Sequence, residues 1–104
     1  MKITPEELKS ILETGKQVVI IDVREPAEYA ICHLRESKLI PMRELPNRTK
    51  ELDSNNFLVL YCHHGIRSLQ ATSWLKRNGF KNVKSLEGGI DAWAKTIDPT
   101  MKCY

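Results

Sequence analysis

The chain has 104 residues, of which 41% are hydrophobic and 28% charged, and its formal net charge at pH 7 is +3. These values predict one soluble globular domain. No run of about 18 apolar residues is present, so we expect no association with a membrane. The basic residues do not form one run, so we expect no nucleic-acid partner, although a weakly basic chain suits small anions.

The N-terminal part begins with a strong helix signal. Thr4-Pro5-Glu6-Glu7 combines an N-cap threonine, a proline at the first helical position and a glutamate at the third, as in a capping box. Gly15 is expected to follow the end of this helix. Residues 17–22 are rich in β-branched side chains, which is typical of a buried parallel strand.

The next part predicts shorter elements. A short helix is expected over residues 25–30, and a short strand at residues 39–40. Residues 42–52 are expected to be helical, in one or two pieces because Pro46 interrupts the segment.

The C-terminal half continues the alternation. Strands are expected at residues 57–61 and 83–86, and helices at residues 68–78 and 90–97, while residues 98–104 show no strong pattern. Alternating strands and helices predict an α/β fold with a parallel sheet covered on both faces. In such sheets, sites form at the carboxyl ends of the strands.

The most informative stretch is Cys62-His63-His64-Gly65-Ile66-Arg67-Ser68, which separates an apolar strand from a helix. Backbone N–H groups of such a loop and of the first helical turn point inward, and the helix dipole adds partial positive charge. An anion is stabilised there, which activates Cys62 as a nucleophile. Gly65 allows a positive φ and a close approach of a ligand, and Arg67 adds a permanent charge.

The pattern C-x-x-G-x-R, from Cys62 to Arg67, resembles the active-site loop of the rhodanese family of sulfurtransferases. Residues 22–41 and 87–93 resemble two further segments of that family, and the resemblance runs from about residue 3 to residue 97. It implies a rhodanese-like three-layer α/β/α fold with a central parallel sheet of about five strands. We therefore expect a single rhodanese domain over residues 1–104, with residues 98–104 as a short tail.

The resemblance also implies an activity. Sulfane sulfur would pass from a thiosulfate-like anionic donor to a thiol or protein acceptor through a persulfide on Cys62. Cys62 and Arg67 would be catalytic. The other loop residues would surround the transferred sulfur: His63, His64, Gly65, Ile66 and Ser68. Three residues elsewhere in the chain would support the loop: Asp22, Arg24 and His33.

Purely structural roles remain open for the same residues. Cys62 is an inert buried thiol in this alternative, and Arg67 belongs to a structural ion pair. Asp22 is then a helix N-cap, Arg24 a surface charge and His33 a packed core histidine.

A metal site is not expected at His63 and His64. Adjacent residues point in different directions, and the usual spacing of two to four residues between ligands is missing. The proposed chemistry requires no metal and no organic cofactor.

Two other classes of function remain open. A rhodanese-like phosphatase or arsenate reductase would use the same thiolate, but the related phosphate loop, C-x5-R, is one residue longer than the loop from Cys62 to Arg67. A non-catalytic rhodanese-like binding module is the other alternative, although such modules often lack the cysteine.

The location is predicted to be cytoplasmic. Residues 1–7 contain no apolar segment of a secretory signal. Three cysteines, Cys32, Cys62 and Cys103, are an odd number at irregular spacing, so no disulfide framework is expected. The roles of Cys32 and Cys103 stay open, and we expect a monomer.

Overall fold

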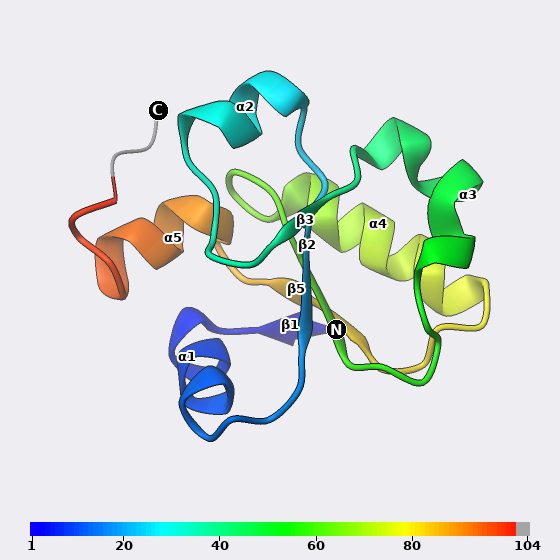
Figure 1. Ribbon diagram of the computed structural model, residues 1–104, viewed down its shortest axis with the longest axis horizontal. Coiled ribbons are helices and arrows are strands. Elements are labelled where there is room, and N and C mark those ends of the chain that lie inside the picture. The colour runs from blue at the N-terminus through cyan, green and yellow to red at the C-terminus, as the bar shows by residue number, and fades with distance from the viewer. Residues whose placement is uncertain (102–104) are drawn as a thin grey trace.

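The computed structural model describes residues 1–101 and shows one parallel sheet between two groups of helices (Figure 1). The strand order is β1-β5-β4-β2-β3, and every neighbouring pair is parallel. The strands are β1 (Lys2–Ile3), β2 (Val19–Asp22), β3 (Lys38–Leu39), β4 (Leu58–Tyr61) and β5 (Val83–Leu86). The expected α/β class and the parallel sheet of about five strands are confirmed.

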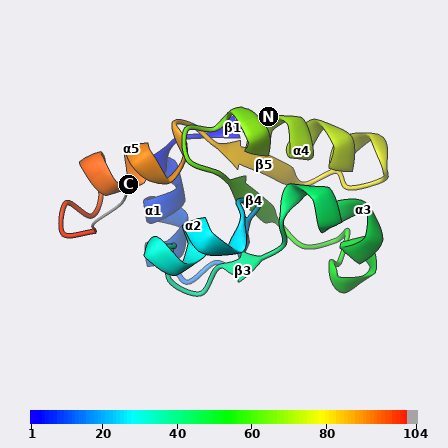
Figure 2. The same ribbon diagram turned by 90° about the horizontal axis from the view of Figure 1, so that it is seen from above.

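Helices connect the strands and cover the sheet. Figure 2, which is seen from above, shows α1 and α5 on one side of the strands and α3 and α4 on the other. The α-helices are α1 (Pro5–Glu13), α2 (Pro26–Ile31), α3 (Leu45–Arg48), α4 (Ile66–Arg77) and α5 (Gly89–Thr96). Two 3₁₀ turns, η1 (Met42–Glu44) and η2 (Thr49–Glu51), flank α3.

The start of α1 follows the sequence prediction. The Glu7 N–H donates to Thr4 Oγ1 at 3.1 Å, and the Thr4 N–H donates to the Glu7 carboxylate at 2.9 Å. This capping box satisfies two N–H groups at the helix start. Gly15 follows the C-cap residue Thr14 with a φ of +76°, as expected for the residue after a helix end.

The segment 42–52 differs from the prediction. It forms three pieces, and Pro46 does not interrupt a helix but lies in the first turn of α3. A proline is tolerated there because the N–H of a first-turn residue has no intrahelical partner. Strand β1 was not predicted from the sequence.

The core has two halves, one on each face of the sheet. Successive strand residues point to opposite faces, so Ile21 packs in one half and Ile20 in the other. Leu45 of α3 and Leu75 of α4 belong to the first half. The second half contains Leu8 of α1 and Ile90 of α5.

The sheet topology decides where a site can form. Strands β2, β4 and β5 are neighbours, and Ile21, Leu60 and Ser85 lie in register across them. The residues that follow these strands therefore meet at one edge of the sheet. None of the helices within residues 1–101 has the length and apolar character needed to cross a bilayer.

Candidate active site

Cys62 lies directly after β4, is 1% exposed and is a free thiol. Its Sγ accepts hydrogen bonds from the N–H of Gly65 at 3.1 Å and from the N–H of Ser68 at 3.4 Å. Gly65 adopts a φ of +101° as the N-cap of α4. That left-handed conformation suits glycine and turns the chain from the strand into the helix within a few residues. Two backbone N–H donors at the start of a helix thus point at this sulfur.

A buried serine pair holds the first turn of α4 against the sheet. The Cys62 thiol donates to Ser68 Oγ at 3.5 Å, and Ser68 Oγ lies 2.7 Å from Ser85 Oγ on β5. Ser68 is fully buried and Ser85 is 1% exposed. Because buried hydroxyls need partners, this contact fixes the hydroxyl beside the Cys62 sulfur.

The start of α5 packs directly on the backbone of the loop. The Ile90 N–H donates to the Cys62 carbonyl at 2.9 Å, and the Asp91 N–H donates to the His63 carbonyl at 3.1 Å. A Cβ on Gly89 would lie 2.4 Å from both carbonyl oxygens. Only a glycine allows this approach, so the Gly88-Gly89 turn anchors the loop as well as ending β5.

Arg67 is paired with a carboxylate that was not predicted as a site residue. Its guanidinium donates to the two oxygens of Glu28 on α2, at 2.9 and 3.0 Å. An arginine at a helix N-terminus is not favoured by the helix dipole, and Glu28 supplies the compensating charge.

Asp22 and Arg24 form a buried ion pair at the end of β2, and both are fully buried. Arg24 Nη2 lies 2.7 Å from Asp22 Oδ2, and it also donates to the Cys32 carbonyl after α2 at 2.6 Å. Arg24 is therefore not a surface charge. The Arg24 guanidinium lies 5.5 Å from the centre of the Tyr61 ring, and this pair joins β2, β4 and the end of α2 below the loop.

The two loop histidines lie at the rim. Their rings meet edge to face with centres 4.1 Å apart, and the His64 side chain is 63% exposed. Burial is the main cause that lowers the pKa of His63, and the neighbouring His64 lowers it further. The pKa of Asp91 is also lowered, chiefly by its hydrogen bond with Lys95.

The space beside the loop is a cavity of about 330 Å³, whose walls include His64, Ile66 and Leu69. Ile66 is 72% exposed, although it is apolar and begins α4. Polar side chains, Lys2 and Glu87 among them, complete the walls. The loop therefore presents an apolar contact surface on its outside, next to the backbone N–H groups that surround the Cys62 sulfur.

His33 lies elsewhere. It is exposed rather than packed in the core, and its ring stacks on Tyr29 with centres 3.8 Å apart. It lines a separate cavity of about 520 Å³, together with Leu34 and Trp93. The structure thus does not bring His33 into the group around the Cys62 sulfur.

Cys32 is disulfide-bonded, contrary to the expectation from cysteine count and spacing. It is thus not a free thiol that could resolve a persulfide on Cys62. Cys103 lies outside the described residues.

Sequence reasoning missed Glu28 and Ser85 as contacts of the site. Ser85 left a signal, because it is a polar residue at an inward-facing position of the strand Val83–Leu86. Glu28 left none, since a lone glutamate in a short helix is typical of solvent-exposed glutamates.

Comparisons with known proteins agree with this geometry. The model of the family described as "Rhodanese-like domain" matches residues 4–96. The probable adenylyltransferase/sulfurtransferase MoeZ of Mycobacterium tuberculosis is 41% identical over 98% of the chain, which spans only 26% of that protein's length. The thiosulfate sulfurtransferase GlpE of Pseudomonas fluorescens is 33% identical, with 91% of this chain and 85% of GlpE covered.

A solved structure shares the fold. The rhodanese-like domain protein from Staphylococcus aureus superposes with a TM-score of 0.84 at 36% identity, covering 88% of this chain and 89% of the other.

Proposed function

Since this chain belongs to the family of rhodanese-like domains, we propose that it is a sulfurtransferase that works through a persulfide on Cys62. The donor is a thiosulfate-like anion, in line with the name of the relative GlpE. The acceptor is a thiol, free or on a protein. The cytoplasmic location and the monomeric state remain predictions.

One observation carries the proposal. Cys62 directly follows a strand, and its Sγ accepts hydrogen bonds from the N–H groups of Gly65 and Ser68 at 3.1 and 3.4 Å. Preorganised donors of this kind stabilise charge that develops during a reaction. They face a sulfur that must be an anion in order to attack, and again an anion when the transferred sulfur leaves.

The reaction is a double displacement. The Cys62 thiolate attacks the outer sulfur of thiosulfate, a new S–S bond forms, and sulfite leaves with the electron pair of the old one. The acceptor thiolate then attacks the outer sulfur of the persulfide, and Cys62 returns as the thiolate. Each step exchanges one S–S bond for another or for an acceptor–sulfur bond, so electrons balance without a redox cofactor.

Other loop residues have supporting roles in this proposal. Arg67 adds positive charge near the loop mouth and is held there by Glu28. His63, His64 and Ile66 form the rim that the donor and the acceptor must pass.

Intact-protein mass spectrometry tests the proposal. The protein is incubated with thiosulfate, with and without a later reductant, as wild type and as Cys62→Ser. We expect a gain of one sulfur atom that the reductant removes and that the variant does not show. Cys32→Ser/Cys103→Ser, which leaves Cys62 as the single cysteine of the sequence, serves as the matched control and should still gain the sulfur.

The contrary outcomes are specific. Sulfur transfer that survives in Cys62→Ser would exclude the persulfide mechanism. A wild type that gains no sulfur from thiosulfate, mercaptopyruvate or a protein persulfide, yet hydrolyses an aryl phosphate, would be a phosphatase instead. A wild type inactive in both assays would point to a binding module.

A further inference from the structure

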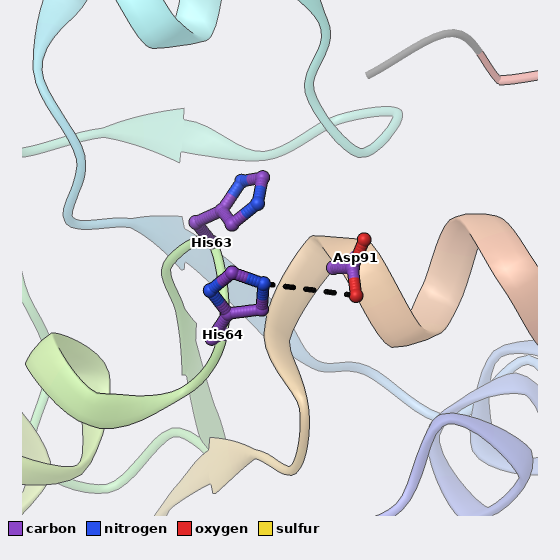
Figure 3. A group of neighbouring side chains, drawn as sticks. All are labelled: His63, His64 and Asp91. Carbon is purple, nitrogen blue, oxygen red and sulfur yellow. Dashed lines mark ion pairs between the residues drawn. The ribbon is translucent and has the colours of Figure 1, made fainter. Parts of the chain in front are cut away.

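Three potential metal ligands meet at the rim of the loop, although the sequence predicted no metal site. Figure 3 shows the rings of His63 and His64 beside the carboxylate of Asp91, which comes from the first turn of α5. Each side chain offers one ligand atom, and these atoms all lie within 4.8 Å of one another. The spacing of ligands along the chain does not report this group, because Asp91 lies on a different element from the two histidines.

The backbone already holds these residues together. The Asp91 N–H donates to the His63 carbonyl at 3.1 Å, so the start of α5 and the loop are joined at two of the three ligand-bearing positions. His64 Nε2 and Asp91 Oδ2 are 3.8 Å apart. A Zn²⁺ ion places nitrogen and oxygen ligands about 2.0–2.2 Å from itself, so side-chain rotations must close the remaining distance before all three atoms reach it.

The cluster already attracts a cation. The Lys95 ammonium lies 3.1 Å from Asp91 Oδ2, and its side chain is 74% exposed. An exposed ion pair of this type stabilises little, so a divalent ion can displace the lysine side chain into solvent. The exposure of His64, 63% for its side chain, gives the ion a direct path to the site.

We propose that His63, His64 and Asp91 bind a divalent transition-metal ion, for which Zn²⁺ is the best match to two imidazoles and one carboxylate. Borderline ions accept this donor set, whereas Mg²⁺ and Ca²⁺ prefer oxygen ligands alone. Three protein ligands leave one position for water or an anion, as in open zinc sites. The inference does not depend on the proposed sulfur transfer, since Cys62 is not among the ligands.

Binding is measured on the untagged full chain in the Cys62→Ser background, because a cysteine thiolate would itself take up Zn²⁺. Competition with a chromogenic chelator gives the stoichiometry and the Kd for Zn²⁺. Co²⁺ provides a second readout through its visible absorption. We expect one ion per chain, with a Co²⁺ spectrum typical of nitrogen and oxygen ligands.

Variants then locate the ion. His64→Ala and Asp91→Asn should each raise the Kd for Zn²⁺ at least about tenfold, since even residues outside the first coordination sphere change metal affinity by that factor. His33→Gln is the matched control, because it removes the one histidine outside the cluster and should leave the Kd unchanged. Thermal unfolding without metal checks that each variant is folded.

Two results would overturn the proposal. One is a Zn²⁺ affinity that His64→Ala and Asp91→Asn leave unchanged, which would place the ion elsewhere. The other is the absence of any Zn²⁺ or Co²⁺ binding at millimolar metal to the folded Cys62→Ser protein.

Discussion

Arg67 and Glu28 form a two-point ion pair that joins α4 to α2, with N–O distances of 2.9 and 3.0 Å. The two residues are 39 positions apart in the chain. The Arg67 side chain is 39% exposed and that of Glu28 is 21% exposed. Paired hydrogen bonds of this type fix the plane of a guanidinium as well as its charge. Glu28 thus orients Arg67 and offsets its positive charge.

Glu28→Gln is expected to lower the KM for thiosulfate, because it removes a carboxylate that competes with the donor for Arg67. Arg67→Gln should raise that KM. The stability loss in Glu28→Gln should stay below about 1 kcal/mol, since the pair is partly exposed. Steady-state kinetics and urea unfolding measure the two effects.

Glu25→Gln is the matched control for this pair. Glu25 is the N-cap of the same helix and pairs with Arg43. Its replacement should leave the KM for thiosulfate unchanged. If Glu28→Gln raised the KM as Arg67→Gln does, the pair would act as one unit and the competition argument would be wrong.

Ser68 and Ser85 should show strong coupling in a double-mutant cycle. Their hydroxyls lie 2.7 Å apart in the core. Ser68→Ala leaves the Ser85 hydroxyl without this partner, which costs about 1–3 kcal/mol of unfolding free energy. Ser68→Ala/Ser85→Ala should lower the unfolding free energy by less than the sum of the two single variants, because no buried hydroxyl then lacks its partner. Urea unfolding of the four proteins measures this, and additive costs would contradict it.

A control for the serine cycle lies on the same helix. Thr72 is fully buried, and within residues 1–101 its Oγ1 has no hydrogen-bond partner. Thr72→Val replaces the hydroxyl by a methyl group of similar size. The unfolding free energy should stay the same or rise.

Gly89→Ala should destabilise the protein more than Gly15→Ala. Both residues have positive φ, +63° and +76°, which costs alanine about 1–2 kcal/mol. At Gly15 a new Cβ would have no atom within 4 Å, whereas at Gly89 it would lie 2.4 Å from the carbonyl oxygens of Cys62 and His63. Gly89→Ala should also slow persulfide formation, because the loop backbone must move. Equal unfolding midpoints for the two variants would argue against this close packing.

The acid stability of the protein should depend on Glu51. Hydrogen bonds from Arg48 and then Lys38 lower the pKa of Glu51 from 4.5 to about 2. Because the folded-state pKa is the lower one, the stabilisation is complete above pH 4.5 and is lost as the pH falls toward 2. Wild type should therefore lose stability more steeply than Glu51→Gln over this range.

Urea midpoints between pH 2 and pH 6 measure that slope. Arg48→Gln removes the main cause of the low pKa, so its slope should also be shallower than that of wild type. A slope that neither variant changes would mean that other carboxyl groups govern acid unfolding.

The sequence by itself determined most of the local elements and the position of Cys62 between a strand and a helix. Thr4 and Glu7 interact within one helical turn. Residues 17–22 are rich in β-branched side chains, a pattern that can be recognised without knowing which residues pack against them. The loop from Cys62 to Arg67 is one continuous segment, so its motif is visible in the sequence. The Gly65 and Ser68 N–H groups reach the sulfur through local geometry alone.

Only the tertiary structure decided which distant residues complete the site. Glu28, Ser85 and Asp91 reach the loop from three other elements, and the spacing of motifs along the chain does not report such contacts. His33 shows the reverse case, since a predicted neighbour of the loop lines another cavity instead. The physical reason is that local propensity depends on neighbours in the chain, whereas a site at the edge of a parallel sheet depends on strand order and on how each helix packs against that sheet.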